Sequence, residues 1–90
     1  REGNQINYYI TETGQEVDFL TTSDDGLRQL YQVSISLRDE DTRKREVNAL
    51  HRAMQEMGLK EACIITLDEE GVFKVKDGKI KIIPLLRFLL

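Results

Sequence analysis

One long amphipathic helix, predicted over residues 39–58, divides this sequence into two β-rich halves and restricts the folds it can adopt. The segment DEDTRKREVNALHRAMQEMG begins with Asp39 and Asp41, either of which can cap a helix N-terminus, where early acidic residues also favour the helix dipole. Gly58 suits the C-terminal stop. The apolar positions between them recur at helical spacing: Val47, Leu50, Ala53, Met54 and Met57. The helix therefore has one face to bury against another layer.

Three segments typical of β-strands precede the helix: residues 4–12, 16–22 and 27–37. Thr13-Gly14 and the run Ser23–Gly26 indicate the turns between them, because Asp-Gly accepts the positive φ angles of tight hairpins. The third strand is predicted to alternate along its whole length. One face is then formed by Leu30, Gln32, Ser34 and Ser36, and the other by Tyr31, Val33, Ile35 and Leu37. We expect these strands to form an antiparallel meander.

After the helix, the apolar segment at residues 61–71 is typical of a strand inside a sheet. Residues 72–84 indicate a second hairpin that turns at Asp77-Gly78, with lysines on its solvent face. Pro84 suits the first turn of a short C-terminal helix. The predicted order is β-β-β-α-β-β-β-α. A long helix that crosses between the third and fourth strands implies a mixed sheet, which is an α/β or α+β fold.

The composition is that of one soluble globular domain. The 90 residues are 40% hydrophobic and 32% charged, and a chain of this length supports a single core. No apolar run approaches the roughly 20 residues of a membrane-spanning helix, so we expect no membrane partner. The one cysteine, Cys63, allows no internal disulfide and lies in an apolar run, which favours a core residue in a reducing cytoplasm. Because the sequence begins with Arg1 and not with Met, we expect it to be a piece of a longer protein.

The net charge of −3 is unevenly distributed along the sequence. Residues 1–40 hold eight acidic and three basic side chains, a balance of −5, whereas residues 41–60 hold five basic and three acidic ones, a balance of +2. A dedicated DNA-binding domain usually has a strongly basic face, so the overall balance argues against DNA as the main partner. The basic residues of the helix leave a weak local contact with nucleic acid open.

Two polar residues occupy central strand positions where core residues are expected. Asp18 and Gln32 each stand between two apolar residues, and Glu16 shares the face of Asp18 by the strand period of two. A strand Asp followed, after a hairpin, by an acid-x-lysine tripeptide has the spacing of a divalent-metal nuclease site, in which carboxylates hold Mg²⁺ and lysine polarises the attacking water. Here the tripeptide is Gln32-Val33-Ser34. Gln32 keeps an oxygen ligand without its charge, and Ser34 lacks the cation.

A structural interpretation competes with the metal site. Asp18 and Gln32 can form a hydrogen-bonded pair that fixes the register of the meander, since buried polar groups must be satisfied. For this chain we favour the structural interpretation. His51 lies at the edge of the apolar stripe of the helix, and we expect a half-buried or surface residue because no second histidine exists to form a site with it.

Several segments together resemble one protein family: EVDFL, QVS, the Thr-Arg-x-x-Glu opening of the helix, and the ending IIPLLRFLL. They are similar to the C-terminal domain of a large group of prokaryotic, notably archaeal, AAA+ ATPases. That domain of unknown function is related to the PD-(D/E)XK, or restriction-endonuclease-like, fold. The resemblance covers residues 12–90, and it implies a restriction-endonuclease-like mixed sheet.

The resemblance assigns roles to residues by position. Asp18 matches the Asp of the family motif, and Gln32 and Ser34 match its Glu and Lys. The acidic residue that the family carries on an N-terminal helix has no counterpart, because that helix would precede Arg1. The resemblance also implies a P-loop ATPase in the preceding part of the chain. ATP would bind only there, since this sequence contains no GxxxxGK[ST] motif.

Three functions follow from these patterns. The first is a non-catalytic, nuclease-like accessory domain of an AAA+ ATPase, without a cofactor of its own, that contacts the rest of its own chain, another protein or, weakly, nucleic acid. The second is a Mg²⁺-dependent DNA endonuclease domain in which Glu16, Asp18 and Gln32 bind the metal and Lys44 replaces the missing lysine. In that case the basic residue has migrated to the helix over residues 41–57, where Arg43 and Arg45 are the alternatives. The third is a dimerisation module that uses the apolar tail at residues 82–90.

Overall fold

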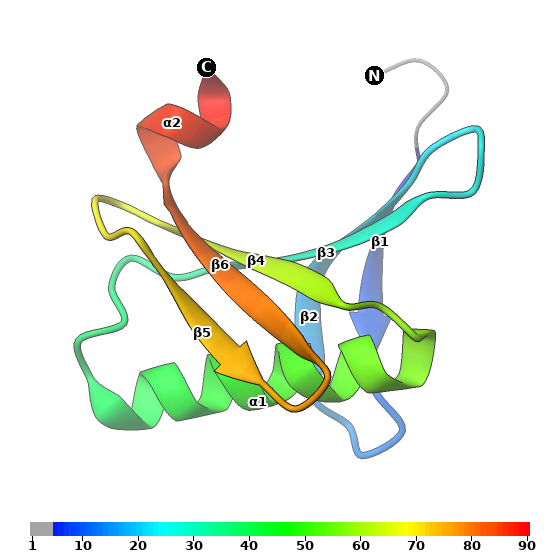
Figure 1. Cartoon of the computed structure of the whole chain (residues 1–90), viewed down its shortest axis with the longest axis horizontal. Coiled ribbons are helices and arrows are strands. Elements are labelled where there is room, and N and C mark those ends of the chain that lie inside the picture. The colour runs from blue at the N-terminus through cyan, green and yellow to red at the C-terminus, as the bar shows by residue number, and fades with distance from the viewer. Residues whose placement is uncertain (1–4) are drawn as a thin grey trace.

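The structure, a computed structural model, describes residues 5–90 and has an α+β fold with a six-stranded mixed sheet and two helices (Figure 1). The strands are β1 (Gln5–Ile10), β2 (Glu16–Thr22), β3 (Arg28–Val33), β4 (Glu61–Thr66), β5 (Gly71–Val75) and β6 (Gly78–Pro84). The helices are α1 (Glu40–Met57) and α2 (Leu85–Leu89). Along the chain the elements follow the order β-β-β-α-β-β-β-α, as predicted.

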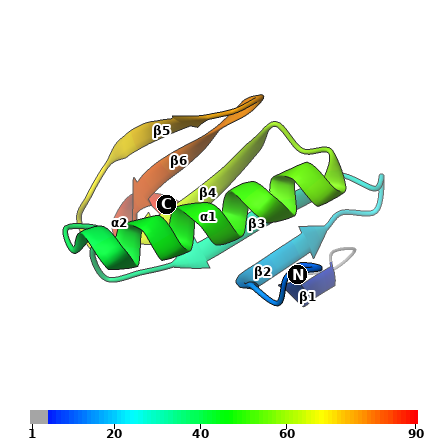
Figure 2. The same ribbon diagram turned by 90° about the horizontal axis from the view of Figure 1, so that it is seen from below.

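In the sheet the strands lie side by side in the order β1-β2-β3-β4-β6-β5. β1, β2 and β3 form the expected antiparallel meander, β4 runs parallel to both β3 and β6, and β5 closes a hairpin with β6. Because β3 and β4 are parallel, the chain must cross over between them, and α1 makes this connection. Seen from below, α1 lies across one face of the sheet (Figure 2).

The helix begins and ends as its capping residues predict. Of the two N-cap candidates, Asp39 is the cap, and its carboxylate accepts a hydrogen bond from the backbone N–H of Thr42 at 2.8 Å. Gly58 ends the helix in the left-handed conformation, with φ +69°. The buried residues of α1 are Ala49, Leu50, Ala53 and Met54.

The core lies between α1 and the sheet and draws on both halves of the chain. Leu50 of α1 is fully buried against residues of four different strands: Val17, Leu30, Ile64 and Ile80. β4 is buried from Ala62 to Thr66, as the apolar run predicts for a central strand, but it ends at Thr66 and not at residue 71 as predicted. The core therefore forms only when the meander, the helix and the C-terminal hairpin come together.

The third strand is shorter than the prediction of residues 27–37, because β3 ends at Val33. The expected alternation also fails. The alternation predicts Ile35 and Leu37 on one face, but Ile35 is 78% exposed and Leu37 is 4% exposed. The physical reason is the carboxylate of Glu69, which accepts hydrogen bonds from the Ser36 hydroxyl and from the Leu37 backbone N–H. These bonds turn the chain out of the strand and lower the pKa of Glu69.

The second hairpin has the predicted turn, with Asp77 at φ +65° next to Gly78. Its lysines are exposed, and Lys79 and Lys81 both form ion pairs with Glu61, at 3.6 and 3.3 Å. Pro84 is the last residue of β6 and the N-cap of α2, one position before the predicted first turn of that helix. Within residues 5–90, no helix is long and apolar enough to cross a membrane.

Gly78 is expected to tolerate no side chain. A methyl group on Gly78 would lie 2.5 Å from the carbonyl oxygen of Lys60 and 2.9 Å from the Met54 methyl carbon, whereas one on Gly71 meets only Ile82 at an ordinary 3.9 Å. We expect Gly78→Ala to lower the free energy of unfolding by about 1–3 kcal/mol. Chemical denaturation of both variants measures this, and equal effects of Gly78→Ala and Gly71→Ala would contradict it.

Candidate functional site

The candidate site lies where β2 separates from β3. Their pairing runs from Thr22 opposite Arg28 to Phe19 opposite Tyr31 and stops there. On its other side, β2 shifts register against β1 between Asn7 and Tyr9. One β1 residue there faces two residues of β2, Asp18 and Phe19, which is the pattern of a β-bulge that bends β2. On its other edge, β3 stays paired with β4, from Tyr31 to Val33 opposite Ile65.

The side chain of Gln32 fills the gap between the separated strands. It is only 2% exposed, and its Oε1 accepts a hydrogen bond from the backbone N–H of Asp18 at 2.7 Å. Its Nε2 donates to the backbone carbonyl of Glu16 at 3.1 Å and to Oε1 of Glu46 at 2.9 Å. This one amide therefore joins β3 to β2 and both of them to α1.

Asp18 makes the reciprocal contact. Its Oδ2 accepts a hydrogen bond from the backbone N–H of Val33 at 2.8 Å. Each strand thus uses a side chain to bond the backbone of the other strand, at the position where ladder hydrogen bonds would otherwise run. This exchange is what a register-holding polar pair requires, and it gives the two unusual polar residues a physical role.

An open pocket of about 580 Å³ lies beside this pair, between the bent end of β2 and the first half of α1. Its lining residues are Gly14, Gln15, Glu16, Asp18, Gln32, Arg45, Glu46, Asn48 and Ala49. Three of them are acidic and one is basic. Burial and the neighbouring Asp18 raise the pKa of Glu46, while Arg45 opposes the shift. The surroundings of Glu46 therefore disfavour its ionised form.

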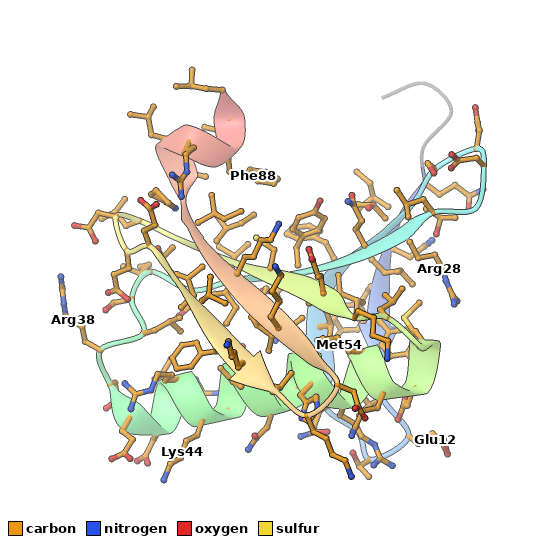
Figure 3. The ribbon with its side chains drawn as sticks, viewed as in Figure 1. Glu12, Arg28, Arg38, Lys44, Met54 and Phe88 are labelled. Carbon is orange, nitrogen blue, oxygen red and sulfur yellow. The ribbon has the colours of Figure 1, made fainter. Side chains whose placement is uncertain are left out.

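The structure brings Glu16, Asp18 and Gln32 together in this pocket, but not Ser34 or Lys44. Ser34 follows the end of β3, where its hydroxyl donates to the carbonyl of Ser36 at 3.0 Å. Lys44 is exposed on the side of α1 that points away from the sheet (Figure 3), with its Nζ 3.5 Å from Glu40.

Of the three basic residues considered from the sequence, Arg45 is the one that lines the pocket. Arg43 instead donates from its guanidinium to the carbonyl of Leu37 at 3.2 Å. A cation is therefore present beside Asp18, but it comes from a different helix position than Lys44.

Sequence reasoning missed Glu46, although a signal was present. Glu46, Leu50, Ala53 and Met57 follow the i, i+4, i+7 spacing of one helix face. An acidic residue in that row must face the sheet or the edge of the core, where it needs a hydrogen-bond donor. Gln32 is that donor.

The carboxylates of the pocket have limited capacity to bind a ligand, because they already accept hydrogen bonds within the protein. Asp18 and Glu46 each use a carboxylate oxygen to accept a bond from β3. No group of three or more His, Cys, Asp or Glu residues in the described part of the chain is placed to hold a metal ion. Every buried side-chain nitrogen and oxygen of that part has a hydrogen-bond partner. The pocket thus has the character of a satisfied polar network.

Two further residues singled out in the sequence lie away from this pocket. Burial raises the pKa of the Cys63 thiol to about 11, so the thiol stays protonated at neutral pH. Nε2 of His51 is 3.1 Å from the carbonyl oxygen of Lys76, next to the second hairpin. Cys63 is buried, as expected of a core residue, and His51 is half-buried, within the half-buried or surface position expected of it.

No protein-family model matches this chain. A search of curated proteins finds no sequence with significant similarity to it. The interpretation of the pocket therefore rests on its geometry and on the sequence segments described above.

Removing the Gln32 amide should destabilise the fold strongly. Gln32→Leu leaves Asp18 N–H, the Glu16 carbonyl and one Glu46 oxygen without their partner, and we expect a loss of about 2–4 kcal/mol in the free energy of unfolding. Gln55→Leu, the same change at an exposed position of α1, is the matched control and should change stability by less than about 0.5 kcal/mol. Urea denaturation compares them, and similar losses in both variants would refute the role assigned to Gln32.

The raised pKa of Glu46 predicts a pH-dependent effect. A carboxyl with a raised folded-state pKa favours folding fully below its usual pKa of 4.5, and this contribution is lost as the pH rises through the raised value. Glu46→Gln should therefore unfold at a higher temperature than the natural chain at about pH 7, with little difference at about pH 3. Calorimetry across this range tests it, with Glu12→Gln as an exposed control. A lower melting temperature for Glu46→Gln at neutral pH is the contrary result.

Proposed function

We propose that this chain is a non-catalytic, nuclease-like accessory domain of an AAA+ ATPase. It acts by contact with protein, the rest of its own ATPase chain included, or by weak contact with nucleic acid. The relation to the restriction-endonuclease-like fold is part of the proposal. A mixed sheet with Asp18 on a bent strand, beside the Gln32-Val33-Ser34 tripeptide, supports that relation.

One observation carries the non-catalytic part of the proposal: the atoms that would bind a metal are used to hold strands together. Oε1 of Gln32 accepts the Asp18 N–H, and Oδ2 of Asp18 accepts the Val33 N–H. Ser34, at the position of the motif lysine, supplies no cation. A metal ion would have to replace bonds on which the junction between β2 and β3 depends.

The net charge of the chain and its proposed cytoplasmic location are both consistent with an accessory role. The net charge of −3 and the excess of acidic residues in the first 40 positions disfavour strong binding to nucleic acid. The proposal places the domain in a reducing cytoplasm, and the single buried thiol of Cys63 supports this placement. ATP would be bound and hydrolysed only by the preceding part of the chain.

A Mg²⁺-dependent DNA endonuclease is the second candidate, and one observation favours it. Glu16, Asp18 and Glu46 line the same open pocket as Arg45. Carboxylate oxygens are the ligands that Mg²⁺ prefers, and Arg45 would take the place of the missing lysine as a cation that has moved to α1. In this candidate, Glu16, Asp18 and Glu46 would hold the metal ion, which would activate the attacking water.

Calorimetric titration with Mg²⁺ and Mn²⁺ separates the two candidates. We expect the natural chain to bind neither ion with sub-millimolar affinity and to leave DNA uncleaved, because the carboxylates are engaged by β3. Asp18→Asn should behave in the same way, and Asp24→Asn, in the exposed turn after β2, controls for the loss of one negative charge. Sub-millimolar binding that disappears only in Asp18→Asn, together with DNA cleavage, would establish the endonuclease.

A further inference from the structure

The two edges of the sheet differ in how they are protected. β1 and β5 are the edge strands. β5 carries Lys74, and Lys76 follows it directly, which are the charges that natural edge strands use against pairing with other chains. β1, from Gln5 to Ile10, contains no charged residue and no proline. Among the described elements, β2 is the only strand that pairs with β1, so its outer backbone groups face away from the sheet.

The side chains of β1 alternate between two environments. Tyr9 points toward α1, and its hydroxyl donates to Oε1 of Glu56 at 2.7 Å. Its neighbours on either side therefore project from the opposite face of the sheet. The residues of that row are Ile6, Tyr8 and Ile10, which are 64%, 55% and 54% exposed. Three exposed apolar side chains in a row lie directly at the unprotected edge.

The order of these three side chains reads the same in both directions. Ile6, Tyr8 and Ile10 form an Ile-Tyr-Ile row, so a second copy of β1 laid antiparallel meets like with like when Tyr8 is at the centre. Ile6 of one copy then stands opposite Ile10 of the other, and the two Tyr8 rings are neighbours. Directly opposite pairs of this kind stabilise antiparallel strands by roughly 0.2–1 kcal/mol each.

We propose that β1 is an interface between two copies of this chain, which pair their β1 strands antiparallel about a two-fold axis through Tyr8. A two-fold interface requires a patch that is complementary to itself, and a palindromic, uncharged strand has this property. β5 lacks it, because Lys74 and Lys76 of two identical copies would repel each other. The resulting dimer has a continuous sheet across both copies, and it is independent of the function proposed above.

Sedimentation equilibrium tests the dimer on the natural chain. We expect a concentration-dependent shift from the monomer mass of 10.4 kDa to twice that mass. Tyr8→Lys and Ile10→Lys should remain monomeric at concentrations where the natural chain is dimeric. Val72→Lys, on the lysine-bearing edge strand at 58% exposure, should dimerise normally. A monomer at every concentration, or a dimer that survives both β1 substitutions, would overturn the proposal.

Disulfide trapping tests the register. In the proposed pairing, Tyr8→Cys places two thiols opposite each other, with Cβ atoms about 4.5–5.5 Å apart, close to what a disulfide spans. Ile6→Cys places its two thiols four residues apart along the strand, about 14 Å. Under mild oxidation we expect a covalent dimer from Tyr8→Cys but not from Ile6→Cys or Val72→Cys, while the buried Cys63 stays reduced. A covalent dimer from Ile6→Cys alone, or equal yields from all three, would contradict this interface.

Discussion

The side chain of Gln32 joins three consecutive elements, β2, β3 and α1, and the rest of the structure depends on this junction. β2 separates from β3 before Phe19, while the opposite edge of β3 stays paired with β4 from Tyr31 to Val33. The separation leaves the backbone N–H groups of Asp18 and Val33 to bond side chains in place of a strand partner. One amide, with an acceptor and two donor hydrogens, satisfies both strands and α1 at once.

The same junction explains why the carboxylates of the pocket are not available to a metal ion. A catalytic site keeps carboxylate oxygens available to a metal, whereas here Asp18 and Glu46 accept hydrogen bonds from the strand they face. The amide of Gln32 brings two donor hydrogens to this position. They bond the Glu16 carbonyl and Glu46, so the residue acts as a hydrogen-bonded joint between β2, β3 and α1.

Local signals in the sequence predicted the elements well. Asp39 and Gly58 bound the helix because caps act within one turn of their own position, and the Asp77-Gly78 dipeptide itself indicates the turn of the second hairpin. The end of β3 could not be predicted in this way. It depends on Glu69, more than thirty positions away, which bonds the backbone N–H of Leu37.

The residues of the pocket were predicted only in part, because some of them also depend on long-range packing. The strand residues Asp18 and Gln32 were found because their polarity conflicts with their position in an apolar strand. On the helix, Arg45 is predicted only as one of three basic alternatives, because turning a helix by one position, about 100°, decides whether Lys44 or Arg45 faces the pocket. Only the packing of α1 on the sheet sets that rotation.

A double-mutant cycle between Asp18 and Gln32 tests the central claim most directly. The free energy of unfolding is measured for the natural chain, for Asp18→Ala, for Gln32→Ala and for the double variant. Because both side chains close the same gap between β2 and β3, the account predicts that their effects are coupled by about 1 kcal/mol or more. Effects that add to within about 0.5 kcal/mol would show that the two residues act independently and would contradict it.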